Sequence, residues 1–75
     1  MNFRERLLQE ADRQGPLRKL ALRRAAKNKA KTAELEQQAR EQLKLGDGPI
    51  DWSSVDVGKF AKWLDAILKI LALFA

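Results

Sequence analysis

The side chains that most often carry out catalysis are missing from this sequence. It contains no histidine, cysteine or tyrosine, which excludes disulfides and Cys/His zinc sites. Ser53 and Ser54 precede a helical pattern, so we expect one of them to cap that helix. Asp47, Asp51 and Asp56 are spaced too widely for a calcium loop and suit turns and caps better. We therefore expect no enzyme activity, no cofactor and no metal ion.

The chemistry that the sequence does offer is ion pairing with an anionic partner. Residues 18–31 hold seven basic side chains and no acidic one. They are Arg18, Lys19, Arg23, Arg24, Lys27, Lys29 and Lys31. Because they spread around most of a helix axis, they favour contact with nucleic acid phosphates or acidic lipid headgroups. The alternative is a solvated helix whose charge only gives solubility.

A second pattern is the amphipathic C-terminal segment, residues 54–75. At about 100° per residue, its large apolar side chains fall within an arc of roughly 160°. They are Phe60, Trp63, Leu64, Ile67, Leu68, Ile70, Leu71 and Phe74. A short chain has few other apolar residues to cover this face, which predicts contact with other protein subunits or with a membrane surface. A core formed within one monomer with the N-terminal helix is the third possibility.

The elements that must position these side chains are all helical. The patterns predict an all-α fold of two or three helices, at about residues 2–13, 16–45 and 54–75. The count is two if the first pair merges through a kink. A 75-residue chain without disulfides buries little surface. We therefore expect an extended arrangement or a small bundle that is ordered by oligomerisation or docking.

The helix boundaries follow from local residue types. Phe3, Leu7 and Ala11 recur every four residues and give the first helix a narrow apolar stripe. Gly15 and Pro16 end that helix and begin the next one. In the first helix, a basic and an acidic residue four positions apart are expected to pair. They are Arg6 and Glu10.

The second expected helix, residues 16–45, consists of strong helix formers but has a thin apolar face. The residues of that face are Leu17, Ala21, Ala25, Leu35, Ala39 and Leu43. Asn28 and Thr32 interrupt it. Gly46 is expected to end the helix.

Charge divides the chain into three regions. The formal net charge is +5, with +6 in residues 1–45 and −1 in residues 46–75. We therefore expect a basic helical arm over 1–45, a Gly/Pro linker over 46–53 and an anchoring helix over 54–75. The first residues are charged, so no signal peptide is expected. Asp65 and Lys69 interrupt the apolar stretch, which disfavours a bilayer span.

These features lead us to expect a small non-catalytic structural or interaction protein of a larger assembly, such as a minor virion component. Its C-terminal helix would contact other subunits, identical or different, and its basic helix would face an anionic partner. One alternative is a membrane-active or peripheral membrane-binding protein. Another is a non-specific nucleic-acid-binding protein that uses the C-terminal helix to dimerise. An intracellular, membrane-peripheral or virion-associated location fits these expectations.

Overall fold

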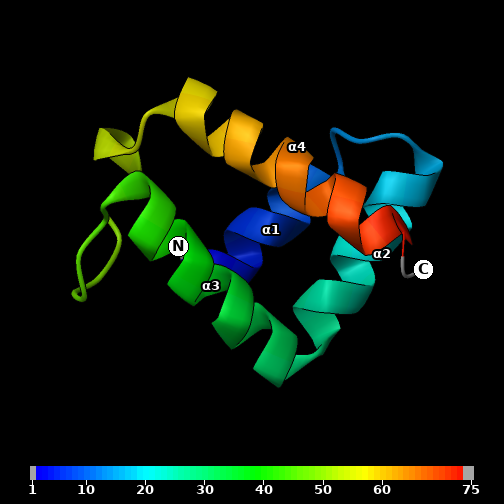
Figure 1. The fold of residues 1–75 in the computed structure, drawn as a ribbon, viewed down its shortest axis with the longest axis horizontal. Helices are drawn as coiled ribbons and strands as arrows, with labels where there is room; N and C mark the ends of the chain where they lie inside the picture. The colour runs from blue at the N-terminus through cyan, green and yellow to red at the C-terminus, as the bar shows by residue number, and fades with distance from the viewer. Residues whose placement is uncertain (1, 74–75) are drawn as a thin grey trace.

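The computed structural model describes residues 2–73, and its regular structure within that range is entirely helical (Figure 1). The elements in chain order are α1 (Phe3–Ala11), α2 (Pro16–Lys27), α3 (Lys29–Leu43), the short 3₁₀ helix η1 (Trp52–Ser54) and α4 (Val57–Leu73). The all-α prediction is confirmed. The expected count of two or three helices is wrong, because four α-helices form. They make a small bundle of 31 × 25 × 19 Å rather than an extended arrangement.

The long helix expected over 16–45 is divided in two at Asn28. This residue has extended backbone angles, φ −95° and ψ 110°, and ends α2 while it begins α3. Its side-chain oxygen accepts a hydrogen bond of 3.0 Å from the Lys31 amide, which is the geometry of a helix N-cap. The Thr32 hydroxyl donates to the Ala25 carbonyl at 2.9 Å and ties the two helices across the bend. The two residues that interrupt the apolar stripe therefore turn the chain.

The first break in the chain occurs where the sequence predicts it. α1 ends at Ala11, Gly15 caps α2, and Pro16 occupies its first turn. The two helices pack against each other as separate elements, so they do not merge through a kink. α3 ends at Leu43, just before the expected stop at Gly46, and Lys44 adopts the left-handed conformation at φ 56°.

The expected start of the C-terminal helix and its serine cap are wrong. Ser53 and Ser54 lie in η1, where both hydroxyls donate hydrogen bonds to the Asp51 carboxylate. α4 begins three residues later than expected, and Asp56 is its cap. The Asp56 carboxylate accepts a hydrogen bond of 3.1 Å from the Lys59 amide. Asp51 and Asp56 thus have the turn and cap roles expected of them. Asp56 takes the capping position expected for a serine, because an ionised carboxylate accepts a hydrogen bond from an amide more strongly than a hydroxyl does.

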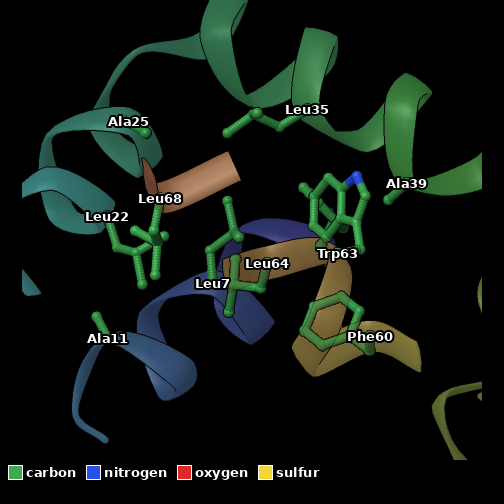
Figure 2. Close-up of a cluster of buried hydrophobic side chains, with 11 residues drawn as sticks. Leu7, Ala11, Leu22, Ala25, Leu35, Ala39, Phe60, Trp63, Leu64 and Leu68 are labelled. Carbon is green, nitrogen blue, oxygen red and sulfur yellow. The ribbon is translucent and has the colours of Figure 1, made fainter. Parts of the chain in front are cut away.

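One hydrophobic core lies between the four helices. Its buried residues are Phe3, Leu7, Ala11, Leu22, Ala25, Leu35, Ala39, Phe60, Trp63, Leu64 and Leu68. The apolar stripe of α1 is confirmed, because all three of its residues are buried. Figure 2 places Phe60 and Trp63 at one end of this core and Leu22 and Ala25 at the other. The large side chains of α4 thus find most of their cover within the chain.

Four aromatic rings gather where α1, η1 and α4 meet. We call Phe3, Trp52, Phe60 and Trp63 the aromatic cluster, and neighbouring ring centroids in it are 5.6 to 6.3 Å apart. The guanidinium carbon of Arg6 lies 5.4 Å from the Trp52 ring centroid and 5.5 Å from that of Phe60. Arg6 also pairs with a Glu10 carboxylate oxygen at 3.4 Å, as the sequence predicts. This half-buried cation fixes α1 against η1 and α4.

Candidate anion-binding surface

The seven basic residues of segment 18–31 do not act as one surface, because four of them have acidic partners. Arg18 pairs with Asp65 of α4 at 2.8 Å. Lys19 and Arg23 both reach a carboxylate oxygen of Asp12, at 3.8 and 3.6 Å. Lys31 pairs within α3, with Glu34 at 3.8 Å. Segment 18–31 itself contains no acidic residue, so all of these partners lie outside it: Asp12 follows α1, Glu34 is in α3 and Asp65 is in α4.

The other three basic residues are exposed and have no acidic partner among residues 2–73. They are Arg24, Lys27 and Lys29, and we call them the basic corner. Lys27 is the last residue of α2 and Lys29 the first of α3, so these two flank the bend at Asn28, and Arg24 lies in the last turn of α2. In Figure 1 this bend lies on the opposite side of the molecule from the loop that follows α3.

The two helix ends at the bend have opposite effects on the positive potential of the basic corner. Arg24 and Lys27 lie in the last turn of α2, where the helix dipole is negative and favours cations. Lys29 lies in the first turn of α3, which has no acidic residue, so it adds to the positive end of that dipole. At the first turn of α3, a bound anion is therefore stabilised, whereas a cationic side chain such as that of Lys29 lowers the stability of the helix.

Arg4 is a basic residue near the corner that the sequence pattern does not single out. Its Nε donates a hydrogen bond of 3.0 Å to the carbonyl oxygen of Ala26, one residue before Lys27. This bond satisfies a carbonyl at the C-terminal end of α2 and places a fourth positive charge beside the basic corner. The residue belongs to α1, so only the packing of α1 on α2 reveals its position.

The apolar residues proposed to contact a partner through α4 separate into three groups. Phe60, Trp63, Leu64 and Leu68 are buried in the core. Ile67 and Leu71 are partly buried against it, and Ile70 is 52% exposed. Phe74 lies outside the described residues. The described part of this face that remains open is thus the C-terminal part of α4, around Ile70.

Two leucines on α2 are exposed, and for Leu17 this contradicts the sequence prediction. Leu17 was assigned to the apolar stripe of the second helix, but it is 84% exposed, and Leu20 is 47% exposed. The bend at Asn28 lets α2 turn Leu22, Ala25 and Ala26 toward the core instead. Leu17 and Leu20 lie on the outward side of α2, and Arg24 and Lys27 follow them at helical spacing.

Two carboxyl groups titrate below their ordinary value. Hydrogen bonds from the hydroxyls of Ser53 and Ser54 lower the pKa of Asp51. A hydrogen bond from Lys69, followed by one from Arg18, lowers the pKa of Asp65. Both carboxylates are thus engaged with side chains of their own protein.

No group of three or more acidic side chains between residues 2 and 73 is arranged to hold a metal ion. Within the same range, no helix has the length and apolar character needed to cross a bilayer.

Comparisons with known proteins identify no relative. No protein-family model, no curated protein and no solved structure matches this chain. Any functional argument therefore depends on the geometry above.

Proposed function

We propose that this chain is a small non-catalytic interaction protein of a larger assembly, and that its basic corner binds an anionic polymer. Nucleic acid is the polymer that we favour. The observation that carries the proposal is the contrast within segment 18–31. Four cations are paired with neighbouring carboxylates, whereas Arg24, Lys27 and Lys29 have no acidic partner among residues 2–73 and lie on either side of one bend.

The electrostatics of the corner support a phosphate partner. Cations concentrated at a bend create a local positive potential, and the dipole of α3 adds to it. Phosphate contacts release condensed counterions, so such binding weakens steeply as salt rises. The corner exposes no aromatic side chain for base stacking, so binding is expected to be independent of base sequence.

The assembly part of the proposal rests on α4. Its exposed Ile70 and partly buried Leu71 leave an apolar area at the end of the helix. Contact through this area does not require the core to open, because the four buried residues of α4 stay in place. Other subunits are the partners that we propose for it.

The test is the salt dependence of binding to fluorescent single- and double-stranded oligonucleotides. With three cations engaged, the plot of log K against log salt for the duplex is expected to have a slope of about −3. Substituting two of them in the double variant K27Q/K29Q is expected to reduce the magnitude of that slope by about 2.

The matched control is the double variant K59Q/K62Q, which removes the same charge from α4. It is expected to keep most of the slope, because Lys59 and Lys62 lie outside the corner. Equal losses from both double variants would show that binding follows net charge alone. That result, or a slope near zero for the unaltered protein, would contradict the proposal.

A second candidate function is peripheral binding to anionic membranes. The observation that favours it is the outward side of α2, where Leu17 and Leu20 are exposed and lead into Arg24 and Lys27. Apolar side chains beside cations are typical of helices that lie in a membrane interface.

Flotation with vesicles separates the two functions. The membrane candidate predicts that the protein floats with anionic phosphatidylserine vesicles and that the substitution Leu17→Ser weakens this binding. It also predicts that added oligonucleotide competes with the vesicles for the same cations. Failure to float at low salt would eliminate this candidate and leave the nucleic acid proposal unaffected.

A further inference from the structure

The side of α4 that faces α3 is hollowed. Trp63, Ala66 and Ile67 of α4 line one side of the hollow, and Gln38 and Gln42 of α3 line the other. Its volume is about 500 Å³, and it is open to solvent. Its lining combines apolar side chains with amides, so it can accept apolar groups while it offers hydrogen bonds along one wall.

A second hollow follows along the same side of α4. It has a volume of about 400 Å³ and lies between Ile70 and Leu71 of α4 and the alanines Ala21 and Ala25 of α2. Ile67 of the first hollow is one helical turn from Ile70 and Leu71. The two hollows therefore lie in line along α4, the first between α4 and α3 and the second between α4 and α2, and we treat them as one groove.

The charged residues that line the described part of this groove are all basic. Lys59 and Lys62 line the first hollow, and Arg24 and Lys31 line the second. Lys31 is paired with Glu34, but the other three have no acidic partner among residues 2–73. An apolar floor with cations at both ends is complementary to a ligand that has an apolar side and acidic flanks.

We propose that this groove binds an acidic amphipathic helix of a partner protein. The groove follows α4 from Lys59 to Ile70, about 16 Å or three helical turns. That length fits apolar anchors at positions i, i+3, i+4 and i+7 of a bound helix, with Glu or Asp beside them. This inference rests on the assembly contact proposed above, and it specifies that the partner subunit presents an acidic amphipathic helix.

Two other occupants fit the groove less well. A second copy of this chain carries a net charge of +5, and its exposed large apolar residues are on the basic helices α2 and α4, including Leu17 and Ile70. A bilayer surface is broad, whereas the groove is a concave space between helices that suits one row of side chains. An acidic helix satisfies both the shape and the charge.

The experiment uses three synthetic helical peptides and the full chain labelled with ¹⁵N. The first peptide places leucines at i, i+3, i+4 and i+7 with glutamates between them. The second keeps the leucines and replaces each glutamate by lysine, and the third scrambles the leucine positions of the first. Amide shifts are expected for the first peptide alone, and they should be concentrated around Lys59–Ile70 and Gln38–Gln42.

Variants locate the binding site. The substitution Ala66→Arg fills the floor of the groove, and Ala61→Arg places the same side chain elsewhere on the exposed surface of α4. We expect A66R to weaken binding of the acidic peptide by at least about tenfold, and A61R to leave it nearly unchanged. The double variant K59Q/K62Q is expected to weaken binding by about tenfold at low salt.

Binding that A66R does not weaken, or equal binding of the acidic and basic peptides, would overturn the inference. If the protein formed concentration-dependent dimers and A66R abolished them, the occupant of the groove would be a second copy of this chain and not a partner helix. If the protein bound vesicles and A66R abolished that binding, the occupant of the groove would be lipid. The oligonucleotide assay of K27Q/K29Q is independent of the groove, so it distinguishes a failure of this inference from a failure of the proposed function.

Discussion

At one end of the core, the guanidinium of Arg6 lies over two rings of the aromatic cluster. The basic corner lies at the bend between α2 and α3, near the end of the core where Ala25 is buried. The guanidinium of Arg6 is held by two ring faces and a carboxylate. The cations of the basic corner have no such partners between residues 2 and 73. The charge of Arg6 thus stabilises the packing at one end, whereas the charges of the basic corner remain exposed to solvent at the other. Substitutions at the first end are expected to affect folding, and substitutions at the second to affect binding.

The largest expected effect is the loss of a ring from the aromatic cluster. Phe60 is 1% exposed and contacts both tryptophans, so Phe60→Ala is expected to cost about 3–5 kcal/mol. A domain of this size has a total stability of about 4–11 kcal/mol, so the variant should be largely or partly unfolded. Urea unfolding followed by circular dichroism measures the change. A loss below 1 kcal/mol would mean that this cluster does not stabilise the fold.

The next effect in size comes from Arg6. We expect Arg6→Ala to lower the free energy of unfolding by about 2 kcal/mol, because it removes the cation from two rings and leaves the buried Glu10 carboxylate with one basic partner, Arg13. Arg6→Lys is the matched variant, since it keeps the charge but loses the planar stacking. If the lysine variant were as stable as the unaltered protein, charge rather than stacking would explain the contact.

At the other end of the core, Asn28 is the residue whose loss matters most for the bend. Asn28→Ala removes the side-chain cap of α3 and is expected to cost about 1 kcal/mol. Asn28→Ser restores a capping oxygen and should recover most of this loss. Thermal unfolding of the two variants provides the measurement. A more stable alanine variant would mean that α2 and α3 can join into the single helix that the sequence pattern predicts.

The smallest effects concern pH. Asp51 lies beside the aromatic cluster and Asp65 tethers α2 to α4, and hydrogen bonds hold both pKa values below the ordinary 3.8. A lowered pKa in the folded state contributes stability above the unfolded value, and this contribution is lost as pH falls through the folded pKa. The acid-induced drop in urea midpoint below about pH 4 should therefore be smaller in Asp65→Asn and in Asp51→Asn. An unchanged drop in both variants would contradict these contacts.

At the aromatic end of the molecule, the contribution of α1 could be predicted from the sequence, because its signals are local. The burial of Phe60 and Trp63 against α1 could not, since the sequence pattern assigns both to a surface for a partner. The stripe of Phe3, Leu7 and Ala11 and the pair Arg6–Glu10 depend on spacings of four residues, and both are present in the structure. The position of Arg6 over Trp52 could not be predicted, since the two residues are far apart in the chain. Helical periodicity contains no information about such contacts.

The basic corner could be predicted only in part. The sequence shows the basic residues themselves. Their pairing with Asp12 and Asp65 depends on how α1 and α4 pack on α2, which the sequence does not show. The break at Asn28 was missed because a single asparagine among strong helix formers is a weak signal. The burial of the apolar face of α4 could not be predicted either, since it requires α1, α2 and α3 to pack on α4 together. The division of the long helix at Asn28 makes this packing possible. The basic surface and the exposed end of α4 therefore emerge from packing rather than from composition.

The most direct test of the account is a titration of ¹⁵N-labelled protein with a short duplex oligonucleotide at low salt. The account predicts amide shifts concentrated between Arg24 and Lys31, little change at Phe60 and Trp63, and reversal of the shifts when salt is added. Shifts spread evenly over all lysines and arginines, or none at low salt, would contradict the assignment of the basic corner as the anion-binding surface.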